Sequence, residues 1–394
     1  MNPLSTLLNL GSSEMLECGL AHTPREIAQQ PVTWLDTFRM LLGRQAQIQQ
    51  FLAAAGLRER AELRPTIFLV GAGTSDYIGH SLHHLLRHHW QCEVIPVAST
   101  SLLTDFPDYL LADRRYLWVS FSRSGDSSEG VAVLERALAE RPNISHLLIT
   151  CNAAGRMMSA VEGRANALGI ALDDATNDRG LAMTSSFTNM VLAGQALAHA
   201  WNMDEFDPIL RSLIQAAQSF MPRAAVLASE LAEDSYSRAC FVGSGALAGA
   251  TMECALKLLE LTAGKFQTLA QPTLALRHGP MAALDRDTLF VSLVSSHPQR
   301  RRYELDLLSE IGAKSLARTR VTIAVTNDAS LRAGAEHVLT FEAPCEIPDL
   351  YRPVLDVIFG QLLGLFSSIR FGLKPDAPSP NGAISRVVQH VGIY

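Results

Sequence analysis

Apolar runs that end in glycine loops occur twice in the chain, in the same order. The run FLVGAG at 68–73 reappears as CFVGSG at 240–245. Two later runs, at 116–120 and 147–152, are echoed at 289–293 and 321–327. Because the offset between partners is about the same each time, the pattern indicates the duplication of one domain. The fold of the first half is therefore expected to recur in the second.

Short strands alternate with helical stretches in the first half. Nearly continuous apolar runs occur at 67–70, 94–97, 117–120 and 147–150. Such runs are typical of strands buried on both faces of a sheet. Strands that alternate with helices form right-handed βαβ units. The sequence therefore predicts an α/β protein of two tandem domains, each a doubly wound parallel sheet flanked by helices.

The remaining segments extend this core at both ends. Residues 1–50 are expected to be helical, with Thr23, Pro24 and Glu26 forming a helix start and a capping box. Helices are also expected at about 187–202 and 207–233. The last residues are rich in Pro, Ser and Gly. The expected ranges are 1–50 for the helical extension, 51–205 and 206–373 for the two domains, and 374–394 for a tail over the active site.

The composition excludes several classes of protein. The 394 residues carry a formal net charge of −6, whereas nucleic-acid-binding proteins usually have a basic surplus. The six cysteines are widely spaced and form no CxxC pair, which fits buried reduced thiols in a cytoplasmic protein. The apolar stretch 354–369 contains Asp356 and Gln361, so it is expected to be a core helix and not a membrane span.

Two loops between a strand and a helix have the composition of anion sites. The loop VGAGTS at 70–75 places glycines before a helix start, where free N–H groups and the helix dipole attract an anion. Asp76 stands where a dinucleotide fingerprint has its third glycine, and no GxxxxGK[ST] motif is present, so nucleotide binding is disfavoured. The loop SFSRSGDSS at 120–128 offers hydroxyls at Ser122, Ser124 and Ser127 for a phosphate. The alternative for this second loop is an ordinary serine-capped turn.

A third polar cluster and a helix carry further candidates. The segment GLAMTSSF at 180–187 is expected to supply polar contacts or to cap the next helix. Glu253, Lys257 and Glu260 share one helix face, which is the pattern of a carboxylate base beside a lysine. The alternative is a surface salt bridge.

Two further histidine features each allow a functional and a structural interpretation. His278 lies in the sequence RHGP, a stiff turn that suits proton transfer near neutral pH, although a structural role is the alternative. Five histidines between His80 and His89 allow i, i+4 pairs for a metal ion, but a solvated helix face is favoured because no HExxH motif is present. Neither a metal nor a cofactor is expected.

Together these motifs resemble the SIS (sugar isomerase) family over about residues 25–394. Gly-Thr-Ser at 73–75, Ser-Arg-Ser-Gly-Asp-Ser at 122–127, Lys-Leu-Leu-Glu at 257–260 and Arg-His-Gly-Pro at 277–280 are similar in order and spacing to the isomerase half of glucosamine-6-phosphate synthase. The tail, with Ser-Pro-Asn-Gly at 379–382, resembles more closely the galactosamine-6-phosphate deaminase/isomerase group, also described as tagatose-6-phosphate ketose/aldose isomerases.

The resemblance implies roles for individual residues. It implies that the sugar phosphate is held by Thr74, Ser75, Ser122, Ser124 and Ser127. It implies other substrate contacts from Gly73, Arg123, Leu181, Thr184, Arg277 and Arg386. It implies that Glu260 moves a proton between C1 and C2, that His278 assists ring opening and that Lys257 tunes Glu260. The family's histidine comes from the partner subunit, so a homodimer with a shared site is implied.

The chain departs from the synthase in two ways. It begins Met1-Asn2-Pro3 without the synthase's glutamine-hydrolysing domain, so we expect it to release ammonia from an amino sugar. Where the synthase tail has a lysine that forms a Schiff base, this chain has Arg386. Arginine stays protonated and is a poor amine nucleophile, so Arg386 is expected to contact substrate or hold the tail.

These observations lead to one expected activity and two alternatives. We expect deaminating isomerisation of galactosamine 6-phosphate to tagatose 6-phosphate and ammonia. The close alternative is an aldose–ketose isomerase without deamination. An alternative of another class is a sugar-phosphate-binding regulator, which would not need the 253–280 constellation. Such regulators are often fused to DNA-binding helices, and no basic helix-turn-helix segment is expected at the N-terminus of this chain.

Overall fold

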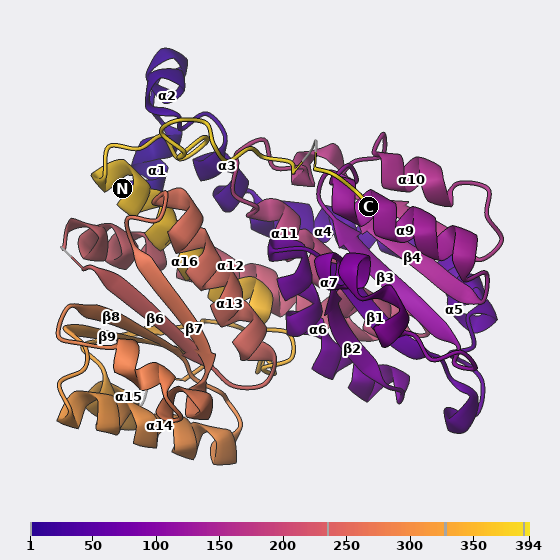
Figure 1. The fold of residues 1–394 in the computed structure, drawn as a ribbon. Coiled ribbons are helices and arrows are strands. Elements are labelled where there is room, and N and C mark those ends of the chain that lie inside the picture. The colour runs from indigo at the N-terminus through magenta and orange to yellow at the C-terminus, as the bar shows by residue number, and fades with distance from the viewer. Residues whose placement is uncertain (1, 235, 327–328, 389–390) are drawn as a thin grey trace. The chain divides into compact units, whose positions relative to one another are not determined.

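The computed structural model describes residues 2–234, 236–326, 329–388 and 391–394. In these ranges the backbone forms two five-stranded parallel sheets, of order β2-β1-β3-β4-β5 and β10-β9-β8-β6-β7 (Figure 1). Two compact units surround them. The first-sheet unit comprises Val32–Asp178, Ser185–Pro208 and Ser385–Tyr394. The second-sheet unit comprises Met1–Pro31, Arg179–Thr184 and Ile209–Ile384.

The first-sheet unit holds the elements from α4 to β5, with α11 after them. Their bounds are α4 Gln30–Gly43, α5 Gln45–Ala54, β1 Thr66–Gly71, α6 Thr74–Trp90, β2 Val94–Ala98, α7 Ser99–Thr104, α8 Phe106–Tyr109, β3 Tyr116–Ser122, α9 Ser128–Glu140, β4 Ile144–Thr150, α10 Arg156–Val161, β5 Ala167–Ala171 and α11 Ser185–Ala198.

The second-sheet unit holds three N-terminal helices and the elements from α12 onward. Their bounds are α1 Pro3–Leu8, α2 Ser12–Cys18, α3 Thr23–Ala28, α12 Asp207–Glu233, β6 Arg238–Gly243, α13 Ala246–Leu261, β7 Gln267–Pro272, β8 Thr288–Leu293, α14 Pro298–Ala313, β9 Thr319–Ala324, α15 Ala329–Gly334, β10 His337–Thr340 and α16 Pro353–Arg370.

The predicted duplication of a doubly wound parallel sheet is confirmed. Read from its other end, the second sheet runs β7-β6-β8-β9-β10, which matches β2-β1-β3-β4-β5 strand for strand. The glycine after each first strand has the same conformation, with φ 55° and ψ −125° at Gly73 and φ 62° and ψ −129° at Gly245. The expected echo at 321–327 forms β9, although its last residue lies outside the described residues.

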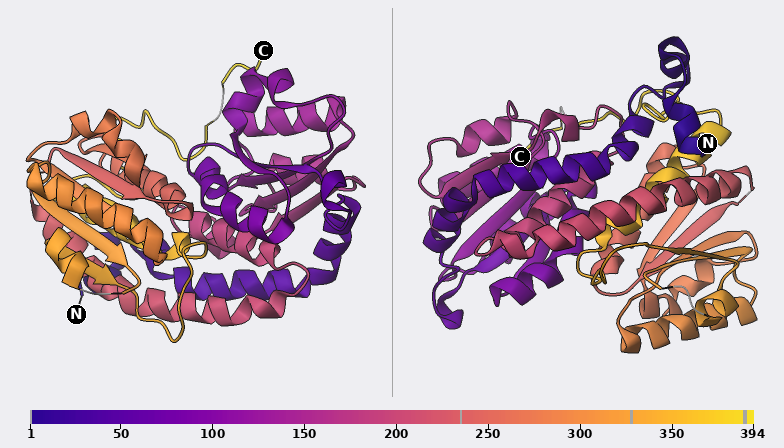
Figure 2. Two further views of the ribbon diagram at one scale, coloured as in Figure 1. Left: turned by 90° about the horizontal axis from the view of Figure 1, so that it is seen from below. Right: turned by 180° about the vertical axis from the view of Figure 1, so that it is seen from behind.

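Each sheet is covered on both faces, as right-handed crossovers require. In the first-sheet unit α6 and α11 pack together, while α7, α9 and α10 pack together on the other face (Figures 1 and 2). Trp118 of β3 lies in the core under the second group, among Phe68, Phe106 and Val133. In the second-sheet unit α13 packs on α16, and the core around Phe290 contains residues of α14 and α15.

The apolar stretch at 354–369 forms α16, as predicted. Among the described residues it is the one helix long and apolar enough to cross a membrane, and 89% of it is buried inside the protein. Gly360 and Gly364 bring its backbone against α13, because a Cβ at Gly360 would lie 2.7 Å from Cys254 and one at Gly364 would lie 2.9 Å from the carbonyl oxygen of Lys257. The helix is therefore a core element that fixes α13.

The two units gather segments that lie far apart in the chain, whereas the expected ranges follow the chain in order. One local prediction is wrong. Thr23 begins α3 as a helical residue, and its hydroxyl donates to Asp376 at 2.8 Å. Glu26 accepts from the backbone N–H of Gly180 at 3.2 Å, and so it does not form the expected capping box. Both side chains bind distant segments, which a local motif cannot reveal.

Candidate functional site

The first glycine loop makes a tight corner between β1 and α6. Gly73 has a positive φ of 55°, a conformation that favours glycine. Gly71 leaves no room for a side chain, because a Cβ there would lie 2.3 Å from the carbonyl of Ser75. Thr74 and Ser75 form the first helical turn and are buried. The corner therefore places two hydroxyls and the N-terminus of α6 at the carboxyl end of β1.

The serine loop, residues 122–127, makes the corresponding corner between β3 and α9. The Ser122 hydroxyl accepts from the N–H of Gly125 at 3.0 Å, and the Ser124 hydroxyl accepts from the N–H of Asp126 at 3.2 Å. As acceptors in these bonds, both hydroxyls keep their own protons for donation to a ligand. Ser127 precedes α9, and its side chain makes no capping hydrogen bond within the described ranges. The serine-cap alternative therefore does not account for Ser127.

The segment after β4 braces the serine loop. Asn152 donates to the carbonyl oxygen of Ser124 at 2.7 Å, and the N–H of Met157 donates to the carbonyl oxygen of Gly125 at 2.9 Å. Gly155 permits the close approach, since a Cβ there would lie 2.7 Å from the carbonyl oxygen of Ser124. These contacts fix the loop before any ligand arrives, which lowers the entropic cost of binding.

The glycine loop and the serine loop lie on adjacent strands at a topological switch point. β1 pairs with β2 on one side and with β3 on the other, so the chain leaves β1 in one direction and returns in the other. Crevices at the carboxyl ends of such strands are the usual ligand sites of open α/β sheets. Two helix N-termini and several hydroxyls there can bind an anion without a lysine.

The C-terminal tail contacts the serine loop inside the first-sheet unit. The Val388 carbonyl oxygen accepts from the N–H of Ser128 at 3.2 Å, and Arg123 donates to the carbonyl oxygen of Arg386. The Arg386 side chain donates to the Asp178 carbonyl oxygen at 2.6 Å and to the side-chain oxygen of Asn177. Arg386 thus anchors the tail, and its role as a substrate contact stays a prediction.

The acid–base candidates form a chain of charges on α13 in the second-sheet unit. The ammonium of Lys257 lies 3.3 Å from a Glu253 oxygen and 2.6 Å from a Glu260 oxygen. The side chains of Lys257 and Glu253 are 0% exposed, whereas that of Glu260 is 29% exposed. The surface salt-bridge alternative is therefore wrong, because two of the three charges are fully buried. Glu260 is the member of the three that a ligand can reach.

The turn after β7 places Arg277 and His278 differently. Arg277 donates to Asp306 and to Glu310, both at 2.7 Å, and the hydrogen bonds to these two carboxylates raise its pKa. His278 is exposed to solvent, and the next residue, Gly279, has a φ of 114°. The structure therefore joins Arg277 to α14 and leaves His278 accessible. The predicted substrate contacts of both residues stay predictions.

The third polar cluster is divided between capping and distant contacts. The Asp178 carboxylate caps α11, because it accepts from the N–H of Ser185 at 3.1 Å and of Ser186 at 2.8 Å. In the second-sheet unit Leu181 N–H donates to the Asp376 carbonyl oxygen at 2.9 Å. Gln361 of α16 donates to the Thr184 carbonyl oxygen at 3.3 Å. The cap of α11 thus comes from Asp178, which lies outside the 180–187 segment, and the substrate contacts of this segment stay a prediction.

The histidine run on α6 makes pairwise contacts. The rings of His83 and His84 have centroids 3.9 Å apart, and His80 lies 3.6 Å from Asp76. Burial lowers the pKa of His83 to about 4. The described ranges contain no group of three His, Cys, Asp or Glu side chains that could hold a metal ion.

Some residues that shape these candidates were missed by sequence reasoning. They are the braces Asn152 and Asp178 and the helix-packing glycines Gly360 and Gly364. Asn152, Gly360 and Gly364 lie far from their partners in the sequence, and Asp178 lies outside the segment that was expected to cap α11. The duplication of the strand pattern was the signal that placed the loops, and it carries no information on these partners.

Comparison with known proteins agrees with this geometry. The SIS domain family matches residues 63–200. A D-galactosamine-6-phosphate deaminase AgaS from Escherichia coli is 34% identical over 380 residues, which cover 94% of this chain and 95% of the relative. An isomerizing glutamine–fructose-6-phosphate aminotransferase from Pyrobaculum aerophilum is 29% identical, over 90% of this chain and 55% of the relative.

A solved structure extends the comparison to the fold. The crystal structure of tagatose-6-phosphate ketose/aldose isomerase from Escherichia coli has a TM-score of 0.82 and 33% identity, over 90% of this chain and 94% of that chain. The TM-score indicates a shared fold, which in this chain contains two five-stranded parallel sheets. The chain, which carries a SIS domain, therefore belongs to the family of the D-galactosamine-6-phosphate deaminases AgaS.

Proposed function

We propose that the chain converts galactosamine 6-phosphate and water into tagatose 6-phosphate and ammonia, using its own side chains. The observation that carries the proposal is the charge chain on α13, in which the buried Lys257 holds the accessible Glu260 at 2.6 Å. Near-full-length similarity to a D-galactosamine-6-phosphate deaminase supports the substrate. A sensor of sugar phosphates would have no use for an accessible proton-transfer group held by a buried lysine.

The proposed phosphate site lies at the switch point of the first sheet. Ser122, Ser124 and Ser127 donate to the phosphoryl oxygens, and Thr74 and Ser75 add donors from α6. The fixed loops and two helix N-termini support this assignment. Holding the phosphoryl group orients the open-chain sugar, and orientation supplies a large part of the rate. Further contacts with the sugar phosphate are proposed for Gly73, Arg123, Leu181, Thr184, Arg277 and Arg386.

Glu260 carries the proposed proton transfer. The carboxylate removes the proton from C2 of the open-chain amino aldose, and the electrons of that bond form an enolamine between C1 and C2. Return of that proton to C1, with transfer of a second proton from the amino nitrogen to O1, converts the aldehyde carbon into a hydroxymethyl group and leaves an imine at C2. Water then adds to C2 and ammonia leaves, which gives the ketose phosphate. Lys257 lies 2.6 Å from a Glu260 oxygen and holds the carboxylate in position for both transfers.

His278 is proposed to assist ring opening. It is exposed on the chain, so it is available to a site shared with a second subunit. We therefore propose a homodimer, and a cytoplasmic location in keeping with the reduced cysteines. Sedimentation of the purified chain tests the first point, because a monomer at the concentrations of the activity assay would contradict a shared site.

A second candidate is plain aldose–ketose isomerisation, favoured by the name of the similar Escherichia coli structure. One assay separates the two. Purified protein is given galactosamine 6-phosphate, glucosamine 6-phosphate or the corresponding aldose phosphate, and ammonia and ketose phosphate are measured together. We expect equal amounts of ammonia and ketose from galactosamine 6-phosphate. Interconversion of aldose and ketose phosphates without ammonia would establish the second candidate.

A further inference from the structure

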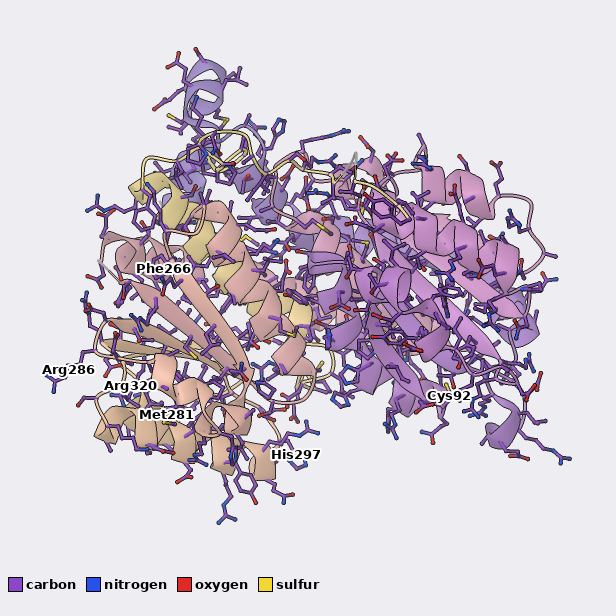
Figure 3. All side chains as sticks on the ribbon, in the orientation of Figure 1. Cys92, Phe266, Met281, Arg286, His297 and Arg320 are labelled. Atoms are coloured by element: carbon purple, nitrogen blue, oxygen red, sulfur yellow. The ribbon has the colours of Figure 1, made fainter. Side chains whose placement is uncertain are left out.

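The second-sheet unit repeats the switch point at which the first-sheet unit is proposed to bind phosphate. β6 pairs with β7 on one side and β8 on the other. The loop after β8, residues 294–297, leads into α14, whose N-cap is His297 (Figure 3). This loop stands in the duplicated fold where the serine loop stands before α9. It also carries adjacent serines, Ser295 and Ser296.

The anion at this second switch point is a side chain of the protein. One oxygen of Asp349 accepts from the N–H of Ser296 at 2.9 Å and from its hydroxyl at 3.0 Å. The other oxygen accepts from the Ser295 hydroxyl. Arg352 donates to Asp349 at 3.2 Å, and Arg300 lies 3.7 Å away. A backbone amide, two hydroxyls and two guanidinium groups form the donor set that proteins use for phosphoryl groups.

The surroundings show that Asp349 is part of a built site. Its side chain is 5% exposed, and the Arg352 beside it is 0% exposed. Although burial alone would raise the pKa of Asp349, Arg352 and the two serines outweigh it and lower that pKa. Arg300 is 48% exposed, so the site lies just beneath the surface and solvent ions can approach it.

Two further carboxylates belong to the same network. Glu304 of α14 accepts from the N–H of Ser295 at 2.7 Å, and burial raises its pKa. Asp356 binds Arg352 at 2.8 Å. With Asp349 removed, Arg300 and Arg352 would face Glu304 and Asp356, so the remaining charges would balance. Binding of one monovalent anion would then restore the net charge that the site has with Asp349 in place.

We propose that Asp349 is an internal anion that occupies, in the second-sheet unit, the position which the duplicated fold offers to a phosphoryl group. The carboxylate holds the 294–297 loop and the start of α14 without any ligand. Removing the carboxylate at Cβ leaves a latent site for a tetrahedral oxyanion, for which inorganic phosphate or sulfate is the probe. The assignment rests on the contacts of Asp349 and not on the identity of the sugar substrate.

Chemical rescue of the full chain tests the proposal. The melting temperature is measured in chloride, sulfate and phosphate at one ionic strength for the natural chain, Asp349→Ala and Asp349→Asn. Both variants should melt lower than the natural chain in chloride, because each loses the charge that Arg352 faces. Sulfate or phosphate should then raise the melting temperature of Asp349→Ala by about 3 °C more than that of Asp349→Asn, whose amide still fills the space.

The controls separate this site from other anion effects. An anion bound at the proposed phosphate site of the first-sheet unit acts equally on both variants, so it cancels in their difference. Asp356→Ala removes the second carboxylate that Arg352 binds and leaves the contacts of Asp349 with the two serines in place. Sulfate or phosphate should therefore not restore the melting temperature of this variant. Equal responses of Asp349→Ala and Asp349→Asn would overturn the proposal, and so would rescue by formate alone.

A second measurement applies if Asp349→Ala folds poorly. If Asp349→Ala is unfolded in chloride, circular dichroism measures the folded fraction in phosphate and in chloride instead. Folding of Asp349→Ala that depends on phosphate supports the proposal, provided that Asp349→Asn shows no such dependence. Absence of folding in both salts would overturn it.

Discussion

The charge of a fully buried ammonium group must be balanced by nearby opposite charges, and Lys257 has a carboxylate on each side. Glu253 and Glu260 lie within 3.3 Å of it along one helix face. The sequence showed the spacing of the three residues but not their burial, which depends on α16 lying against α13. Burial is what turns an ordinary i, i+4 pattern into a site with fixed charges.

Loss of the ammonium should be costly for this reason. Lys257→Met leaves Glu253 buried without a counter-charge, and we expect the free energy of unfolding to fall by about 3–5 kcal/mol. Glu253→Gln combined with Lys257→Met removes both buried charges and should recover most of the loss. Urea denaturation of both variants measures the difference. Equal losses in the single and double variants would contradict the assigned charge pair.

Ser127 offers a test that separates a ligand contact from a helix cap. A capping serine replaced by alanine costs about 1 kcal/mol of stability. Because the Ser127 side chain makes no cap bond within the described ranges, Ser127→Ala should leave stability unchanged within about 0.5 kcal/mol. It should raise KM for the sugar phosphate about tenfold, the effect of one lost hydrogen bond to a charged group. Unchanged KM together with lower stability would restore the capping alternative.

His146 predicts a pH dependence of stability. It is buried in β4 with its ring centroid 5.5 Å from that of Trp118, and burial followed by the charge of Arg164 lowers its pKa from 6.5 to about 4. Between these pH values the unfolded chain binds a proton that the folded chain does not, so stability falls as the pH drops from 6.5 to 4. The pKa shift corresponds to about 3 kcal/mol.

Replacing the histidine should remove this contribution. His146→Phe keeps an aromatic ring against Trp118 but binds no proton. The free energy of unfolding of this variant is measured between pH 4 and 6.5. Its slope against pH should correspond to one fewer proton taken up on unfolding than in the natural chain. The same slope in both proteins would contradict the assignment.

At the scale of secondary-structure elements, the central strands could be predicted and most edge strands could not. β1, β3 and β4 are buried on both faces and carry continuous apolar runs. The missed strands β5, β7 and β10 all lie at sheet edges. β7 has the sequence QTLAQP and no fully buried residue. Edge strands need fewer apolar residues, so the pattern that identifies central strands fails there.

The two glycine loops form a matched pair at the element scale. Gly73 and Gly245 share a positive φ, and nothing lies within 4 Å of a Cβ added at Gly73. Gly73→Ala and Gly245→Ala should therefore each cost about 1–3 kcal/mol through backbone strain. Only Gly73→Ala should raise KM, because its loop belongs to the proposed phosphate site. Thermal melts and steady-state kinetics check both, and a raised KM for Gly245→Ala would contradict the assignment.

At the scale of the whole molecule, the duplication predicted the architecture but not the composition of the two units. Both sheets, their order and the position of the loops follow from the repeated strand–glycine pattern. Some segments belong to a unit that is not their neighbour along the chain, namely 2–31, 179–184 and 385–388. Their placement depends on contacts such as those of Asp376 and Arg386. Such contacts depend on the folded backbone, and the local sequence carries no trace of them.

The two copies have also diverged in their chemistry. The first-sheet unit keeps a hydroxyl-rich loop at its switch point, and the second-sheet unit fills the same position with Asp349. The second unit instead carries the charge chain on α13. One duplicated fold thus supplies a proposed binding function in one copy and a proposed proton-transfer function in the other.

The most direct test of the account is Glu260→Gln, which keeps the shape of the side chain and removes its basicity. Binding of galactosamine 6-phosphate by equilibrium dialysis and release of ammonia are measured on the same preparation. We predict that binding is retained within about threefold and that ammonia release falls by at least about 10³-fold, as expected for loss of a proton-transfer group. Ammonia release by Glu260→Gln at the natural rate would contradict the account.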